Sequence, residues 1–241
     1  MRLDRFISEG MRVPRKHALT MVKSGQVTVD GVVVRDAGLQ IADGHTGVCH
    51  HDVPIAPATS LLLILYKPMG HVTTTEEGRG PTVMDLVPEP LRRKDLAPIG
   101  RLDKDTTGLL LLTTEGSINH ALTHPRRHVE KAYVAGIDIP LDPNAAERFA
   151  AGLTLADGTL CQPAELEVLA PLQLRIVVRE GRFHQVKRMV ATCGATVLTL
   201  HRERIGQLLL PEDLVPGQCR PLTTAESAIL GIFTANGDAP A

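Results

Sequence analysis

One polar loop in the sequence places a carboxylate between two cations. It reads Gly100-Arg101-Leu102-Asp103-Lys104-Asp105-Thr106-Thr107-Gly108, and an apolar run from Leu109 to Leu112 follows it directly. Asp103 has Arg101 and Lys104 on its two sides, and a carboxylate near cations stays ionised, as a nucleophile or a general base must. A buried strand after the loop would hold it in place, as a catalytic site requires. The same composition also fits a surface turn in which Asp and Thr side chains bond backbone amides.

A second segment, residues 179–204, is locally basic. It contains six Lys and Arg residues against two acids, a net charge of +4. Gly181-Arg182-Phe183-His184-Gln185 is predicted to open a helix that ends at Thr192, with Lys187 and Arg188 on its first turns. Free amides at the start of a helix bind phosphate well, so the segment favours polyanion binding. Solvated charge on two ordinary elements is the alternative interpretation.

Histidine clusters raise the question of a metal site. One cluster consists of His120, His124, Arg126, Arg127, His128 and Lys131. Its spacing matches no common metal site, so phosphate contact or plain surface is favoured. The triplet Cys49-His50-His51, with His45 nearby, lacks a second ligand pair and is interpreted as a polar surface turn.

Neither of the phosphate-binding motifs GxGxxG and GxxxxGK[ST] occurs, which argues against an enzyme that uses a nucleotide cofactor. We expect a site that uses neither metal nor cofactor.

The overall composition narrows the class of protein. The 241 residues include 26 basic and 27 acidic residues, so the net charge of −1 excludes a uniformly basic chromatin-like protein but not a local basic face. Aromatic residues make up 2%, which argues against an extended groove of stacking rings. No stretch of 18 apolar residues occurs, the N-terminus lacks a secretory signal, and the four cysteines are far apart. These features predict a cytoplasmic protein with no membrane association.

The elements that must position these side chains fall into two groups. In residues 1–53, Leu3, Phe6 and Ile7 repeat at helical spacing, Pro14 suits the start of a second helix, and Asp-Gly between two β-branched runs predicts a hairpin over residues 27–34. The apolar run at residues 61–66 predicts a buried strand after a linker at residues 54–60. Further strands are predicted at residues 109–112, 131–137, 172–178, 197–200 and 208–210, and helices at residues 144–151 and 184–192.

Helices are too few and too irregularly placed for alternating βαβ units. The pattern therefore predicts an α+β fold: a small N-terminal domain of two helices plus a hairpin (residues 1–53), a linker (54–60), and a larger domain (61–231) with a mixed, mainly antiparallel sheet. The tail, residues 232–241, is predicted to be disordered.

Five motifs, in this order, resemble those of the pseudouridine synthases of the ribosomal small-subunit type, the RsuA-like family. They are Tyr66-Lys67-Pro68-Met69-Gly70, the loop from Gly100 to Leu109, Lys131-Ala132-Tyr133, the segment from Glu180 to Met189, and His201-Arg202-Glu203-Arg204-Ile205-Gly206. Residues 1–43 are similar to the S4 RNA-binding domain. The resemblance covers residues 1 to about 230.

The resemblance implies the isomerisation of a uridine in 16S rRNA to pseudouridine, with no cofactor. Asp103 would be the catalytic carboxylate, acting on the sugar either as nucleophile or as base, and Lys187 its paired cation. Tyr133 would stack on the flipped base, and Arg101 would help to extrude the nucleotide, because a stacked base is sterically blocked. Further substrate-binding residues are expected at Lys67, Thr107, Arg182, His184, Gln185, Arg188, Arg202 and Arg204. RNA contacts of the S4-like domain are expected at Arg2, Arg5, Arg15, Lys16, Lys23 and Ser24.

Three rival functions remain at this point. The first is a synthase of the same family that acts on 23S rRNA, since the catalytic motifs are shared. The second is a non-catalytic rRNA-binding assembly factor, and the third a metalloprotein that uses the histidine clusters. The expected partner is ribosomal RNA, either 16S rRNA or a small-subunit assembly intermediate, bound by a monomer.

Overall fold

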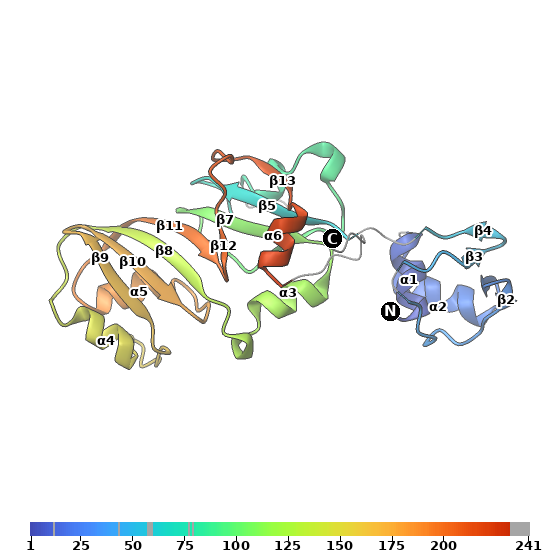
Figure 1. The fold of residues 1–241 in the computed structure, drawn as a ribbon, viewed down its shortest axis with the longest axis horizontal. Coiled ribbons are helices and arrows are strands. Elements are labelled where there is room, and N and C mark those ends of the chain that lie inside the picture. The colour runs from blue at the N-terminus through green and yellow to red at the C-terminus, as the bar shows by residue number, and fades with distance from the viewer. Residues whose placement is uncertain (12, 43, 57–59, 77, 79, 232–241) are drawn as a thin grey trace. The chain divides into compact units, whose positions relative to one another are not determined.

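The chain folds as two compact units. The computed structural model describes residues 1–241 apart from residues 12, 43, 57–59, 77, 79 and 232–241 (Figure 1). The units divide between Ser60 and Leu61. The tail predicted to be disordered and residues 57–59 of the predicted linker lie outside the described residues. No helix in the described part of the chain is long and apolar enough to span a membrane.

The N-terminal unit packs two helices against a small sheet. The helices are α1 (Leu3–Gly10) and α2 (Arg15–Lys23), and the strands, in the order β2-β1-β3-β4, are β1 (Val27–Val29), β2 (Val32–Val33), β3 (Val48–His50) and β4 (Val53–Pro54). The apolar face of α1, with Phe6 and Ile7, packs in one core with Val22 and Val27. Asp30 and Gly31 both have positive φ, as the predicted tight hairpin requires.

Two predictions for this unit differ from the structure. Cys49 and His50 lie in β3, not in a surface turn, and the turn comes after them at His51 and Asp52. Pro54 lies in β4 and Ile55 is buried in the core, so the unit extends into the predicted linker. Neither β3 nor β4 was predicted, because strands of only two or three residues are too short to give a recognisable sequence pattern.

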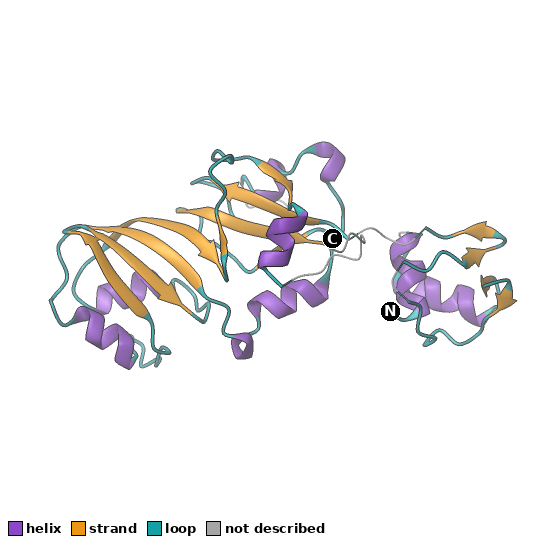
Figure 2. Cartoon of the chain, in the orientation of Figure 1, coloured by secondary structure: helices purple, strands orange, loops and turns teal. Residues whose placement is uncertain are grey.

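The larger unit is built on one sheet of nine strands among the described residues (Figure 2). Its main order is β13-β5-β7-β11-β8-β10-β9, with β6 paired to β7 and β12 to β11. The strands are β5 (Leu62–Lys67), β6 (Ala97–Ile99), β7 (Thr106–Thr113), β8 (Lys131–Ile137), β9 (Glu165–Ala170), β10 (Gln173–Val178), β11 (Val197–Ile205), β12 (Leu208–Leu209) and β13 (Cys219–Pro221). Among the described strand pairs, β7 and β11 alone run parallel. The prediction of a mixed, mainly antiparallel sheet is confirmed.

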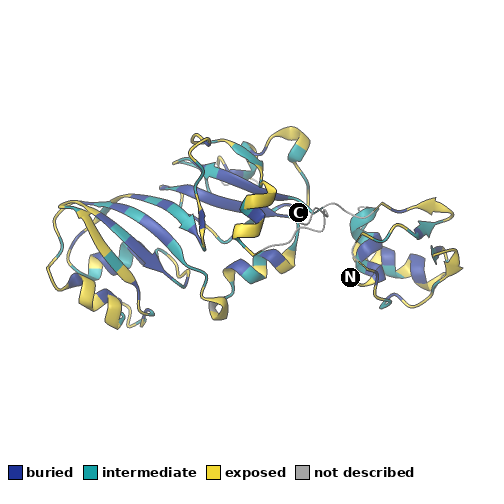
Figure 3. Cartoon of the chain, in the orientation of Figure 1, coloured by how far each residue is buried: buried dark blue, intermediate teal, exposed yellow. Residues whose placement is uncertain are grey.

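The helices cover the two faces of this sheet and leave a core on each. They are α3 (Gly116–Thr123), α4 (Ala145–Ala151), α5 (Gln185–Thr192) and α6 (Thr224–Ile229), with short 3-10 helices at Val83–Leu86, Glu89–Leu91 and Pro125–Arg127. Phe149 of α4 and Met189 of α5 share a core with Leu110 of β7, whereas Leu122 of α3 shares the opposite core with Leu111. Strand β7 is thus buried on both faces (Figure 3).

The parallel pairing of β7 and β11 extends both strands beyond their predicted ends. Thr106 to Gly108 pair with Leu200 to Arg202, so β7 begins three residues before the predicted strand. Gly108 permits this pairing because its φ is +108° and a Cβ there would lie 2.2 Å from the carbonyl oxygen of Arg202. The end of the polar loop is therefore strand, and only its first part, around Asp103, remains loop.

Candidate active site

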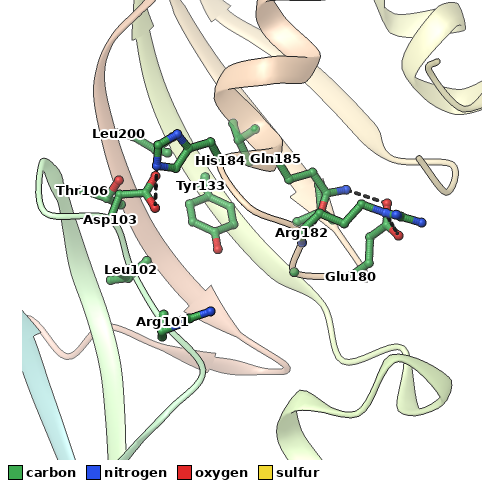
Figure 4. A pocket seen from close by; sticks show the side chains of 13 residues that line it. Arg101, Leu102, Asp103, Thr106, Tyr133, Glu180, Arg182, His184, Gln185 and Leu200 are labelled. Atoms are coloured by element: carbon green, nitrogen blue, oxygen red, sulfur yellow. Dashed lines mark hydrogen bonds and ion pairs between the residues drawn. The ribbon is translucent and has the colours of Figure 1, made fainter. Parts of the chain in front are cut away.

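Asp103 lies where the loop before β7 meets the start of α5. Its Oδ2 is 3.2 Å from Lys187 Nζ. Its Oδ1 is 3.5 Å from His184 Nε2, and Figure 4 shows these two side chains. The Asp103 side chain is 27% exposed, so the carboxylate is accessible while its contacts with Lys187 and His184 hold its direction. A carboxylate held in this way is suited to act on a substrate atom as nucleophile or as base.

Lys187 is shared between two carboxylates. Its Nζ also lies 2.5 Å from Asp105 Oδ1. Burial lowers the pKa of Lys187, but the contacts with Asp105 and Asp103 raise it by more, so the net direction is upward. The same contact lowers the pKa of Asp105, because the hydrogen bond from Lys187 favours the ionised carboxylate. The lysine is therefore a permanent cation at neutral pH and offsets the repulsion between the two carboxylates.

The loop that carries Asp103 is held from beneath by a buried lysine. Lys67, at the end of β5, is fully buried, and its Nζ donates to the carbonyl oxygens of Pro68, Lys104 and Thr106 at 3.1, 3.3 and 2.7 Å. Burial lowers the pKa of Lys67 to about 8. Lys67 was expected to contact substrate, but the structure has it bonded to the loop backbone instead.

Thr73 holds the same loop from a second side. Its hydroxyl donates to the carbonyl of Leu102 at 2.7 Å, and the amide of Leu102 lies 3.2 Å from that hydroxyl. Sequence reasoning missed Thr73, because nothing in the surrounding residues signals its long-range contact. It also left Asp105 out of the site, although its position two residues after Asp103 could have suggested a shared cation.

A buried polar network shapes the loop before α5. Glu180, 7% exposed, accepts bonds from Gln185 Nε2 at 2.7 Å and from Arg182 Nε at 3.0 Å. Gln185 Oε1 in turn accepts from the amide of Arg182, and His184 adopts a left-handed backbone with φ +49°. Gln185 and Arg182 were expected to contact substrate. Both line the smaller cavity beside Asp103, and both are also bonded to Glu180, which helps to hold the turn that carries His184 and Lys187.

An open cavity of about 490 Å³ lies beside Asp103 and has Tyr133 in its wall. Arg202 lies in the same lining, 2% exposed, with Nε donating to the carbonyl of Leu109 at 2.8 Å and Nη1 lying 3.5 Å from the Tyr133 hydroxyl. Lys131 also lines the cavity, and burial lowers its pKa to about 8. A smaller cavity of about 70 Å³, also lined by Asp103 and Tyr133, adjoins the buried Thr106 hydroxyl. The carboxylate thus faces a space with an aromatic wall and a cationic lining.

Four of the predicted substrate-binding residues do not line these cavities: Lys67, which is described above, and Thr107, Arg188 and Arg204. Thr107 lies on the opposite face of β7, where its hydroxyl is 2.9 Å from His201 Nδ1. Arg188 pairs with Asp157 at 2.5 Å, and Arg204 pairs with Glu130 at 3.2 Å. Much of the charge of residues 179–204 is thus neutralised by carboxylates distant in sequence, which the local count of charges could not reveal.

Four of the six residues expected to contact RNA in the N-terminal unit are bonded to other groups of that unit. Arg2 and Arg15 both bond Asp4, Arg5 pairs with Glu9, and the Ser24 hydroxyl donates to the carbonyl of Met21. Lys16 and Lys23 are exposed. In the described part of the chain, no three His, Cys, Asp or Glu side chains gather as a metal-ligand set.

Comparison with known families agrees with this fold. Residues 61–192 match the family described as RNA pseudouridylate synthase, and residues 1–46 match the S4 domain. The chain therefore belongs to the RNA pseudouridylate synthase family, whose members are isomerases, and carries an N-terminal S4 domain.

Individual relatives match over nearly the whole chain. It is similar to the ribosomal small subunit pseudouridine synthase A of Escherichia coli, at 44% identity over 95% of this chain and 99% of that protein. The protein of the same name from Salmonella typhimurium is 42% identical over 96% of this chain and 100% of its own length. A crystal structure of a pseudouridylate synthase, 35% identical, superposes with a TM-score of 0.68 and covers 95% of this chain and 99% of that one.

Proposed function

We propose that this chain converts one uridine of small-subunit rRNA to pseudouridine and that Asp103 is the catalytic carboxylate. The observation that carries the proposal is the contact of Asp103 with Lys187 at the edge of a cavity that has Tyr133 in its wall. Strand β8 supplies the tyrosine, α5 the lysine and the loop before β7 the aspartate. The site is thus formed by three segments far apart in sequence.

The reaction needs only the groups already present in the substrate and the site. The bond between the uracil nitrogen and the sugar breaks, the base turns, and carbon 5 of the ring forms the new bond to the same sugar carbon. The hydrogen on carbon 5 leaves to solvent, and the released nitrogen gains a proton. Asp103 acts on the sugar, by attack or by removal of a proton, and each route requires the ionised carboxylate that Lys187 favours.

The cavity accepts the target base after it leaves the RNA stack. A volume of about 490 Å³ lies within the range of pockets that hold molecules of nucleoside size. Tyr133 stacks on the base, and the exposed Arg101, which lines the same cavity, helps to extrude the nucleotide. Unstacking costs a few kcal/mol, which contacts with the flipped base must offset.

The relatives support small-subunit rRNA over 23S rRNA as the substrate. The relatives from Escherichia coli and Salmonella typhimurium are named as ribosomal small subunit enzymes and match this chain over at least 95% of its length. The S4 domain adds exposed basic residues, among them Lys16 and Lys23, for contact with RNA phosphates. Binding through phosphates weakens as salt rises, so affinity for the rRNA is expected to fall steeply with ionic strength.

The decisive experiment combines a deletion strain with the variant Asp103→Asn. Pseudouridine mapping of all rRNA in the strain that lacks this protein is expected to show one missing site in 16S rRNA, restored by the wild-type chain. Asp103→Asn should leave the site unmodified while the purified variant still binds the RNA. The matched control Asp142→Asn alters an exposed carboxylate outside the site and should restore modification.

Other outcomes point to the rival functions. A missing site in 23S rRNA would place the chain with the large-subunit enzymes. A full set of pseudouridines in the deletion strain would favour a non-catalytic assembly factor, and full activity of Asp103→Asn would refute the role of Asp103. Bound metal together with loss of activity in chelator would favour a metalloenzyme.

A further inference from the structure

Phe183 projects from the loop before α5 with most of its ring in solvent. It is 74% exposed, and one ring face stacks on His184 with centroids 3.7 Å apart and planes inclined by 19°. His184 is in turn 3.5 Å from Asp103. An exposed phenylalanine forgoes the stabilisation that burial of its ring would supply, and a ligand that covers the ring would recover it.

The surrounding backbone holds this ring outward. The neighbouring Gln185 is only 5% exposed and is bonded to the buried Glu180. His184, the next residue after Phe183, has the left-handed backbone that reverses the chain into α5. The buried Glu180–Gln185 pair thus fixes the loop and presents the aromatic face at the edge of the site.

The charges beside Phe183 indicate what covers it. The cavity that Phe183 helps to line has five cationic side chains and, among the described residues, one carboxylate, Asp103. The cationic residues are Arg101, Lys104, Lys131, Arg182 and Arg202. A flat aromatic face beside an excess of cations suits a nucleobase attached to a phosphate backbone better than an apolar peptide.

We propose that Phe183 stacks on an unpaired nucleobase next to the target uridine. The protein would then contact two bases of the strand, the target at Tyr133 and a neighbour at Phe183. This inference rests on the function proposed above. The base on Phe183 is not the target, because the His184 ring lies between Phe183 and the carboxylate. Tyr133, inside the cavity, takes the target base, and Phe183 takes a neighbour. The stack positions the RNA strand and is not part of the chemistry.

The test pairs variants of Phe183 with RNA that lacks single bases. The substrate is an RNA fragment centred on the uridine found by mapping, and the reaction is followed by release of tritium from carbon 5. Phe183→Leu is expected to raise KM roughly 5- to 150-fold, the range measured for loss of one stacked base, with a smaller change in kcat. Phe183→Trp should stay near wild type, and Ile139→Ala, which removes an exposed apolar side chain outside the site, is the control.

The abasic fragments identify the base that Phe183 covers. Fragments with one base removed at each of the three positions on either side of the uridine are assayed with wild type and with Phe183→Leu. At one position, base removal and Phe183→Leu should each raise KM, while both together raise it no further than one alone. The inference fails if Phe183→Leu stays within twofold of wild type, or if the two effects multiply at every position. A wild-type chain that releases no tritium from intact RNA would instead refute the proposed function.

Discussion

Replacing Lys187 by methionine tests whether the pairing of this lysine with Asp103 is what makes the site active. Methionine has a similar length but no charge, so Lys187→Met leaves Asp103 and Asp105 without the cation that lies 3.2 Å from one and 2.5 Å from the other. We expect kcat/KM to fall while the fold is retained, because Lys187 is partly exposed and its Nζ pairs with Asp103 and Asp105, both of which lie on a partly exposed loop.

The magnitude follows from the distance and the partial exposure. Two unit charges 3.2 Å apart attract each other by about 1 kcal/mol in water and by about 5 kcal/mol at an effective dielectric constant of 20. The side chains are 22% and 27% exposed, so the interaction lies between these limits. At about 1.4 kcal/mol for each factor of ten, these limits correspond to a loss of kcat/KM of roughly 5- to 4,000-fold.

Tritium release from labelled RNA, measured under single-turnover conditions, gives the rate of the chemical step. Lys187→Arg should retain activity within about tenfold because it keeps the charge. Asp105→Asn should change the rate little, since it frees Lys187 for Asp103 alone. The double variant, Lys187→Met with Asp105→Asn, should recover part of the loss because it removes the unneutralised neighbour. A rate for Lys187→Met within threefold of wild type, or a double variant no faster than the single, would refute the reasoning.

Three further predictions concern the elements that hold the site. Lys67→Met removes the donor to three loop carbonyls and should lower the free energy of unfolding by ~2–4 kcal/mol in urea titration, whereas an unchanged midpoint would contradict the supporting role of Lys67. Gly108→Ala should cost roughly 2–5 kcal/mol because its Cβ would overlap the Arg202 backbone, while the control Gly116→Ala, with open space around it, should be neutral or slightly stabilising. The pKa of Glu226 is lowered to about 2 by its bonds to Arg220, so its contribution is present above pH 4.5 and is lost as the pH falls toward 2. The difference in unfolding free energy between wild type and Glu226→Gln should therefore shrink across that window, and a constant difference would exclude this linkage.

The sequence predicted those elements whose cause is local. Asp-Gly fixed the hairpin at residues 30 and 31, helical spacing located α1, and β8 begins and ends at the predicted residues. The aspartate and lysine could be paired in advance only through the family resemblance, since 84 positions separate them. Their observed contact agrees with the expected placement.

The features that sequence reasoning misjudged depend on long-range contacts. Thr107 faces away from the site because β7 begins earlier than expected, which places Thr106 on the cavity face and Thr107 on the other. Arg204 is neutralised by Glu130, a residue 74 positions away. Gln185 turns inward because Glu180 is buried beside it. Local charge and composition carry no information about such partners. The sequence therefore overestimated how many cations of residues 179–204 are free to bind phosphate.

The parallel junction between β7 and β11 also decides when the site comes into existence during synthesis. Asp103 lies in the loop before β7, in the half of the unit built from residues 61–113. Tyr133 lies in β8 and Lys187 in α5, in the half built from residues 131–205. Strand β13, at residues 219–221, completes the first half by pairing with β5. A chain still emerging from the ribosome therefore contains the aspartate long before it contains the lysine, and its sheet is complete only after nearly all of the sequence has been made. The contact between Asp103 and Lys187 therefore cannot form until both halves of the sheet have been synthesised.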